Sequence, residues 1–276
     1  MAEDERLGYL TPLQRFGATV RDVRTGRKIT QKHLGTYAGY SEAYVSKVEK
    51  GTMKPSQRFA EKCDCVFQTR GMFVRLLGDI ERDDNPSWFV PYLEREREAS
   101  RVLDFSTTSI MGIFQTEEYA HAVFRAGHPR ESAEFIHTKV GARLRRRDIL
   151  TQDNRPLVWV VLHEACLRTV VGGTAVMAAQ LDHLVLSAES PSVDFQVVPF
   201  SAGAAAAHVP AFTLLTFDED PSVVYSDDPQ GGRLYQQPET VALFSEHYDR
   251  LRSHALAPTD SLTFIDKIRK EYLSWH

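Results

Sequence analysis

Apolar residues in the first eighty positions recur at helical spacing in short stretches, three of which stop at a glycine. In the first stretch, Phe16, Val20 and Val23 would share one face of a helix. The expected helices begin near Leu13, Thr30, Ser41, Pro55 and Arg70. The first three end by Gly26, Gly39 and Gly51, the fourth includes Val66, and the fifth ends by Ile80. This pattern predicts an all-α domain of five helices over residues 1–80.

Residues 81–85 form a charged stretch that ends at Pro86, and they mark the expected domain boundary. The chain beyond it has a different pattern. Helical spacing covers 91–103, 116–125, 132–151, 174–187, 239–255 and 259–273, and runs rich in β-branched and aromatic residues cover 157–162, 193–198, 212–217, 223–225 and 233–235. The helix at 174–187 separates the first two predicted strands, which allows them to be parallel. We expect a mixed α/β domain over residues 86–276.

The segment from Thr30 to Gly51 reads TQKHLGTYAGYSEAYVSKVEKG. Its apolar residues Leu34, Val45 and Val48 would pack two helices against each other. Gly39 permits the left-handed turn between these helices, and Ser41 caps the second one. This arrangement predicts a helix-turn-helix whose second helix presents the residues near its start to a DNA major groove. The alternative is a helical hairpin that binds no DNA.

The same segment resembles the Xre/lambda-repressor-like family pattern TQxxLAxxxGxSxxx[IV]Sx[IV]ExG over all 22 positions, except that Gly35 replaces the usual alanine. That glycine would weaken the helix by about 1 kcal/mol but permit closer packing. The resemblance implies a phosphate contact by Gln31 and a structural role for Glu49. It also implies base reading by Glu42, Ala43, Tyr44 and Lys47. The residues suited to the DNA backbone are Ser41, Ser46, Lys50, Thr52 and Lys54.

The chemistry of three of these side chains fits base edges. Lys47 can donate to guanine O6 and N7, Glu42 can accept from cytosine N4, and Ala43 can touch a thymine methyl group. The sequence therefore predicts a transcriptional regulator that recognises particular DNA sequences.

Charge is distributed unevenly along the chain, which has a net charge of −4 in total. Residues 1–80 hold 14 Lys and Arg against 9 Asp and Glu, a net of +5, so the rest carries −9. DNA contacts should therefore fall on the first domain, with phosphate contacts supplying much of the affinity. Because one copy of this first domain is only modestly basic, we expect the protein to bind as a homodimer to an inverted repeat of double-stranded DNA.

Candidates for chemistry elsewhere are weak. His163 and Glu164 start like a zinc-protease HExxH motif, but residue 167 is leucine. Cys166 beside His163 could form a nucleophile and base, although a packed structural pair fits better. Cys63 and Cys65 lack the CxxC spacing of metal and redox sites, and three cysteines are too few for a disulfide framework, so they are expected to be small buried hydrophobic residues. We expect no catalytic residue, metal or cofactor.

A basic run lies at Arg143 and Arg145–Arg147. It is typical of the solvated face of a helix, and the alternatives are an acidic partner or a flanking DNA phosphate. The sequence also shows no apolar run long enough to cross a membrane, and its first residues are acidic where a secretory signal would be basic. We therefore expect a cytoplasmic protein with no membrane contact.

The second domain is similar to the C-terminal domain of WhiJ-like regulators from filamentous actinobacteria. The similarity lies in MGIFQTEEYAHAV (111–123), VPFSAG (198–203) and FTLLTF (212–217), with Trp88, Leu93–Ala99 and Val224–Tyr225 in support. The usual Pro-Gly before Gln-Thr-Glu is Met111-Gly112 here. The resemblance implies an antitoxin-like regulator, often encoded beside a small partner protein.

We therefore expect the second domain to dimerise, to sense an effector or to bind a small partner protein. The loop from Phe200 to Pro210, with its small side chains, is the expected contact surface or else an ordinary connection. Two other functions stay open. One is an antitoxin-like protein that mainly sequesters a toxin-like partner and binds DNA secondarily, and the other is an enzyme that uses a cleft in this domain.

Overall fold

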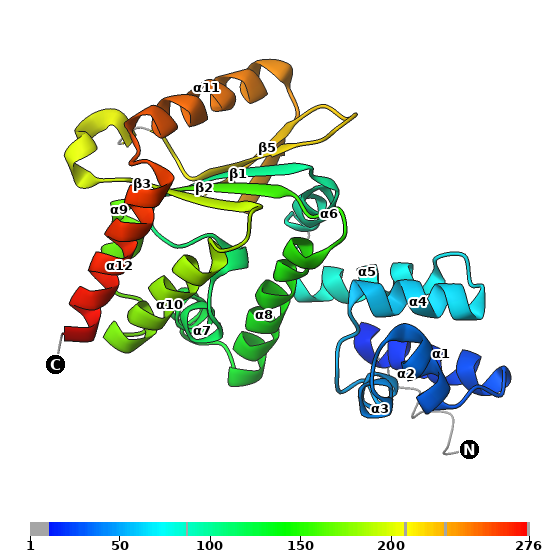
Figure 1. The fold of residues 1–276 in the computed structure, drawn as a ribbon. Coiled ribbons are helices and arrows are strands. Elements are labelled where there is room, and N and C mark those ends of the chain that lie inside the picture. Colours follow the sequence, from blue (N-terminus) through cyan, green and yellow to red (C-terminus); the bar gives the residue numbers. More distant parts are fainter. Residues whose placement is uncertain (1–10, 87, 207–208, 229–230, 275–276) are drawn as a thin grey trace. The chain divides into compact units, whose positions relative to one another are not determined.

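The computed structural model describes residues 11–86, 88–206, 209–228 and 231–274 (Figure 1). The chain forms two compact units, Met1–Pro86 and Ser87–His276. Each unit has a hydrophobic core of its own. No helix of the described residues is long and apolar enough to cross a membrane.

The first unit is helical. Its helices are α1 (Pro12–Gly26), α2 (Gln31–Ala38), α3 (Glu42–Glu49), α4 (Gln57–Phe67) and α5 (Met72–Asp84). The side chains of Thr11, Thr30, Ser41 and Ser56 cap the first four helices. Buried Phe16, Val20, Leu34, Val45, Val48, Phe59 and Phe73 form the centre of the core.

The helix α5 ends later than the sequence predicts. It continues past Ile80 to Asp84, into the charged stretch expected to link the domains. Glutamate and arginine are good helix formers, so their charge alone does not end a helix, whereas the residue before a proline is disfavoured in the helical conformation. The helix accordingly stops just before Asn85 and Pro86.

Two glycines shape the turn between α2 and α3. Gly39 adopts φ 81° and ψ 29°, the left-handed conformation that favours glycine, directly after α2. Gly35 is buried, and a Cβ added there would lie 2.7 Å from the carbonyl oxygen of Tyr40. The departure from the usual alanine at residue 35 thus goes with a closer approach of α2 to the turn.

The second unit is built on one mixed sheet in the order β3-β2-β1-β4-β5-β6. The strands are β1 (Arg101–Ser106), β2 (Leu157–His163), β3 (Val193–Val198), β4 (Phe212–Thr216), β5 (Val223–Asp228) and β6 (Gly231–Tyr235). The pairs β1–β2 and β2–β3 are parallel, with Arg101 opposite Leu157 and Val158 opposite Val193. The pairs β1–β4, β4–β5 and β5–β6 are antiparallel.

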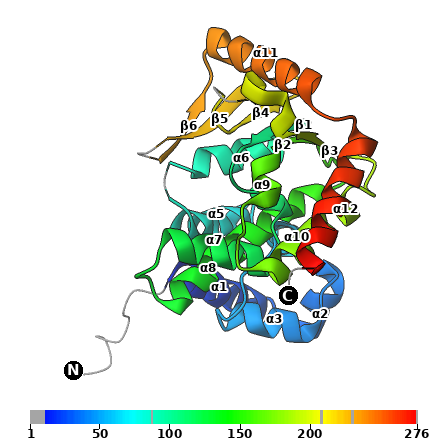
Figure 2. The same cartoon turned by 90° about the vertical axis from the view of Figure 1, so that its left-hand side faces the viewer.

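Helices cover both faces of this sheet. The helices are α6 (Val90–Glu98), α7 (Glu117–Gly127), α8 (Ala133–Arg145), α9 (Glu164–Arg168), α10 (Thr174–Ser187), α11 (Pro238–His254) and α12 (Pro258–Ser274), with 3-10 turns η2 (Gly112–Phe114), η3 (Arg146–Thr151) and η4 (Phe200–Ala206). Figures 1 and 2 show α11 over one face and α10 with α12 on the other. Tyr248 and Leu251 of α11 pack on Phe105 and Phe212, whereas Met177 of α10 belongs to the core of the opposite face.

Two expected helices of the second unit differ from the structure. The expected helix at 91–103 ends at Glu98, and Arg101–Ser106 forms β1, an inner strand of the sheet. Val102, Leu103 and Phe105 are all buried, because helices cover both faces here. Asp104 interrupts this apolar run, so the sequence does not show the pattern of a buried strand. The expected helix 132–151 likewise divides into α8 and η3.

Candidate DNA-binding site

The exposed face of α3 carries most of the predicted base-reading side chains. Glu42 and Ala43 lie in the first turn and Lys47 in the last, and all three are exposed. The opposite face holds buried Val45 and Val48, which fix α3 in the core. The helix therefore presents one polar strip to solvent, as major-groove recognition requires.

Tyr44 differs from its neighbours in its surroundings. Its ring stacks on Tyr40 with centroids 4.3 Å apart and meets the edge of Phe59 at 5.2 Å. Its hydroxyl accepts a hydrogen bond from the backbone N–H of Ser56 (3.1 Å). Burial is the largest cause that raises the pKa of Tyr44. Both ends of this side chain are thus engaged within the protein, and Tyr44 positions α3 against α4.

Apart from Gln31, the residues predicted to contact the DNA backbone lie in α3 and next to its two ends. The Ser41 hydroxyl accepts from the N–H of Tyr44 (3.1 Å), and the Thr52 hydroxyl donates to the carbonyl of Lys47 (3.1 Å). Both of these residues, together with Lys50, are exposed, whereas Ser46 and Lys54 are half-buried. The structure brings these side chains together around both ends of one helix.

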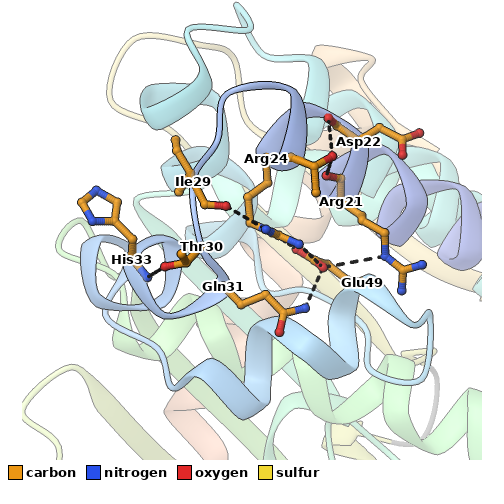
Figure 3. A network of polar contacts seen from close by, with 9 residues as sticks. Arg21, Asp22, Arg24, Ile29, Thr30, Gln31, His33 and Glu49 are labelled. Atoms are coloured by element: carbon orange, nitrogen blue, oxygen red, sulfur yellow. Dashed lines mark hydrogen bonds and ion pairs between the residues drawn. The ribbon is translucent and has the colours of Figure 1, made fainter.

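A buried carboxylate, Glu49, organises the base of the helix-turn-helix (Figure 3). Its side chain is 0% exposed and accepts Arg24 Nε at 2.5 Å and Arg24 Nη2 at 2.9 Å. The Gln31 side chain donates through Nε2 at 2.7 Å to Oε2, the Glu49 oxygen that also accepts Arg24 Nη2. Arg24 also donates to the carbonyl of Ile29 (2.7 Å), at the loop that leads into α2. The Glu49 carboxylate thereby ties α1, α2 and α3 together and holds the amide of Gln31.

Charge complementarity explains why a buried carboxylate is tolerated there. The hydrogen bond to Glu49 is the largest cause that raises the pKa of Arg24, so the guanidinium keeps its positive charge beside this carboxyl group. Arg21, with a side chain 52% exposed, lies further out, its Nε 3.9 Å from a Glu49 oxygen. Gln31 is the first residue of α2, where the early amide N–H groups of a helix lack partners within it. This helix start therefore offers donors and a nearby cation to a phosphate group.

Sequence reasoning missed Arg24 and Arg21. Both lie in α1, and Arg24 stands 25 residues before its partner. The one available signal was an acidic residue at 49 directly after buried Val48, which indicates a carboxylate that needs a cation nearby.

The residues of the second unit that were candidates for a nucleophile, a base or a metal ligand make packing and hydrogen-bonding contacts instead. Cys166 is buried, and its thiol donates to the carbonyl of Ser106 (3.2 Å); burial raises its pKa. The His163 ring meets Phe200 at 5.4 Å. Glu164 accepts from Arg168 (2.5 Å) and from the N–H of Phe200 (2.7 Å). Among the described residues, no three or more His, Cys, Asp or Glu side chains are grouped to hold a metal ion.

The loop predicted as a contact surface begins with a short helical segment. Phe200–Ala206 forms η4, with a kink at Gly203, and the Phe200 ring is 52% exposed. Residues 207 and 208 lie outside the described part of the chain.

Comparison with known families follows this division into two units. Residues 20–71, which contain α2, the turn and α3, match the helix-turn-helix family, so the first unit is an Xre-like helix-turn-helix DNA-binding domain. Residues 89–267 match the domain of unknown function DUF5753, and the chain belongs to this family. No curated protein and no solved structure matches the chain.

Proposed function

We propose that this protein is a transcriptional regulator that recognises a particular DNA sequence through α3. The observation that carries the proposal is the exposed strip of Glu42, Ala43 and Lys47 on a helix whose other face is locked into the core. These side chains would read base edges in the major groove, and Tyr44, whose ring and hydroxyl are engaged internally, would position the helix.

The backbone contacts in this proposal anchor the helix on the duplex. Gln31, held by Glu49 at the start of α2, would contact one phosphate, with Arg21 beside it. The remaining contacts would come from Ser41, Ser46, Lys50, Thr52 and Lys54. Such contacts fix register without reading sequence.

We further propose a homodimer on an inverted repeat. A single first unit, with a net charge of +5 over residues 1–80, offers few phosphate contacts, and two first units joined in a dimer double them. Half-site centres should then lie about 10 base pairs apart, or a multiple of that spacing.

For the second unit we propose a binding role rather than a catalytic one, because His163, Glu164 and Cys166 are engaged in packing contacts. Its similarity to WhiJ-like domains favours an antitoxin-like regulator whose second unit binds a small protein or an effector. The net charge of −9 outside the first eighty residues supports a basic protein partner. Two half-buried arginines, Arg143 and Arg147, support a small anionic effector instead. We favour the effector, because these two side chains define a specific binding site for it.

The experiment is selection of bound duplexes from a random DNA pool by the full chain, together with genome-wide mapping of bound DNA. We expect one enriched inverted repeat and footprints that cover both half-sites. Lys47→Ala combined with Glu42→Ala serves as the matched control, because both side chains are exposed and the fold should survive. Enrichment of no sequence, or of the same sequence by the control, would refute base reading by α3. A footprint on one half-site from a monomer would refute the dimer.

A further inference from the structure

Arginines of the basic run at 143–147 turn inward instead of forming a solvated face. They lie where α8 ends and η3 begins. The guanidinium of Arg146 is 13% exposed and lies 5.2 Å from the ring centre of Phe89 and 5.4 Å from that of Tyr92. Arg143 and Arg147 are half-buried. The interpretation of this run as a solvated helix face is therefore wrong.

Arg146 has a full counter-charge. Its Nη2 lies 2.6 Å from one oxygen of Glu96 and its Nε 3.0 Å from the other. The Tyr92 hydroxyl donates to the same carboxylate at 2.5 Å. This ion pair is bidentate and buried, with the Glu96 side chain 2% exposed, so it forms part of the core.

Arg143 and Arg147 have neutral partners instead. Arg143 Nη1 donates to Gln115 Oε1 at 3.0 Å, and Arg147 donates to the backbone carbonyl of Gln115. The Nε of Arg147 is buried without a hydrogen-bond partner. Within the described part of the chain, neither guanidinium forms an ion pair with a carboxylate. Both guanidinium groups thus contact Gln115, and among the described residues neither has a carboxylate bound to it.

The surroundings hold these two arginines in place. Gln115 is buried, and its amide donates to the carbonyl of Ile110 at 2.6 Å. Gln180 joins the neighbouring residues, accepting from the N–H of Thr116 (2.7 Å) and donating to the carbonyl of Phe114 (2.8 Å). The Arg143 guanidinium also lies over the Phe124 ring at 4.2 Å. The site is built from fixed partners and is not a set of mobile surface side chains.

The surroundings of Arg143 and Arg147 disfavour the charged forms of both guanidinium groups. Burial, followed by the like charge of Arg146, lowers the pKa of Arg143 to about 10. Burial also lowers the pKa of Arg147. The charge of Asp227 acts on Arg143 in the opposite direction, but the Asp227 carboxylate already accepts a hydrogen bond from the hydroxyl of Tyr225. A bound anion would supply the missing negative charge.

We propose that Arg143 and Arg147, positioned by Gln115, bind the carboxylate or phosphate group of a small molecule. Planar guanidinium groups match these oxyanions through paired hydrogen bonds. The half-buried position of both arginines favours a small ligand over a flat protein surface or a DNA backbone. The proposal rests on the proposed function only for its consequence, namely that this ligand would be the effector of the second unit.

The test measures anion binding by the full chain without DNA. Inorganic phosphate and succinate are the probes, with sodium chloride at equal ionic strength as the reference. Thermal unfolding is followed by tryptophan fluorescence, because Trp88, Trp159 and Trp275 all lie in the second unit. At a probe concentration ten times its Kd, we expect the midpoint to rise by about 3 °C beyond chloride. Calorimetric titration gives the Kd and the stoichiometry.

Arg147→Gln and Arg143→Gln should weaken binding of the better probe at least tenfold. Arg155→Gln, which removes the same charge from an exposed position, should leave it unchanged. If Arg143→Gln fails to fold, the affinities of Arg143→Lys and Arg147→Gln for the better probe test the proposal in its place. No midpoint shift beyond chloride with either probe, or equal binding by all variants, would overturn the proposal. Stronger binding of phosphate than of succinate would identify a phosphate ligand, and the reverse a carboxylate.

A separate arm measures DNA affinity of Arg147→Gln with no small anion present. We expect it to be unchanged. A uniform loss over all DNA sequences would assign these arginines to DNA phosphates and refute the small ligand. Because the anion measurement contains no DNA, its failure leaves the proposed function of α3 standing, and failure of DNA recognition leaves the anion site standing.

Discussion

Removal of the Glu49 carboxylate should loosen the whole helix-turn-helix. The change Glu49→Ala leaves the guanidinium of Arg24, 11% exposed, without its counter-charge and releases the amide of Gln31. Breaking a buried ion pair from one side costs about 3 to 5 kcal/mol, because the remaining charge stays buried and unpaired. Replacing both partners by apolar residues costs much less, so Arg24→Met with Glu49→Met should retain most of the stability.

The assay must report on the first unit alone, because a protein of two units need not unfold in one step. All three tryptophans lie in the second unit, so hydrogen exchange of peptides from α2 and α3 is the suitable probe. We expect protection in these peptides to fall by about 3 kcal/mol or more in Glu49→Ala, and by clearly less in the double variant. Tryptophan fluorescence should stay as in the parent protein.

A second readout separates stability from function in the same variants. The double variant keeps its fold but loses the acceptor that holds Gln31, so its affinity should fall for every DNA sequence alike. The single variants Arg24→Met and Glu49→Met complete the double-mutant cycle. If Glu49→Ala lost less than about 1 kcal/mol, or if the losses of these two single variants were additive in the double variant, the reasoning about this network would be refuted.

Four further substitutions test other parts of the structure. Gly35→Ala should destabilise the first unit, because overpacking against the Tyr40 carbonyl costs about 1 to 3 kcal/mol and the gain in helix propensity is about 1 kcal/mol. Gly78→Ala, which has open space around it, should stabilise α5 by about 1 kcal/mol. Hydrogen exchange measures both changes. Ser41→Ala should cost about 1 kcal/mol through loss of the α3 cap, measured in the same way. Burial raises the pKa of Asp104 from 3.8 to about 6, so its contribution to stability is present below pH 4 and lost as pH rises through 6. Asp104→Asn should therefore stabilise the second unit at pH 7.5, by up to about 3 kcal/mol, and give no gain at pH 4, as followed by tryptophan fluorescence during denaturation.

Local signals explain why the helices of the first unit could be predicted closely. Hydroxyl caps at Thr30, Ser41 and Ser56, and a glycine in the left-handed conformation at 39, act within a few residues. Such features specify where a helix begins or ends without help from the rest of the fold.

Contacts between distant residues could not be predicted. The strand β1 was missed because its burial depends on helices from elsewhere in the chain, and because Asp104 is stabilised by hydroxyls that include that of Thr213, 109 residues away. The ion pair of Arg146 with Glu96 joins residues 50 positions apart, so the sequence shows a basic run but does not show that its side chains point into the protein. Periodicity predicts which face of an element is apolar, but it does not identify the partner that a charge will meet.

The same limit applies to the recognition helix. Sequence resemblance placed Tyr44 among the base-reading residues, and only the packing of its ring between Tyr40 and Phe59 shows that it is engaged inside the protein. Glu42, Ala43 and Lys47 remain exposed on one strip of α3.

The central claim, that α3 reads base edges while the start of α2 holds the backbone, is tested most directly by one binding measurement. Affinities of the parent protein, Lys47→Ala, Glu42→Ala and Gln31→Ala are measured on the selected repeat and on duplexes that each carry one changed base pair, at constant salt. We predict that Lys47→Ala and Glu42→Ala lose about 1 to 3 kcal/mol on the selected repeat and little on duplexes changed at their own base pair, whereas Gln31→Ala weakens every duplex equally. A uniform loss in all three variants would contradict the account.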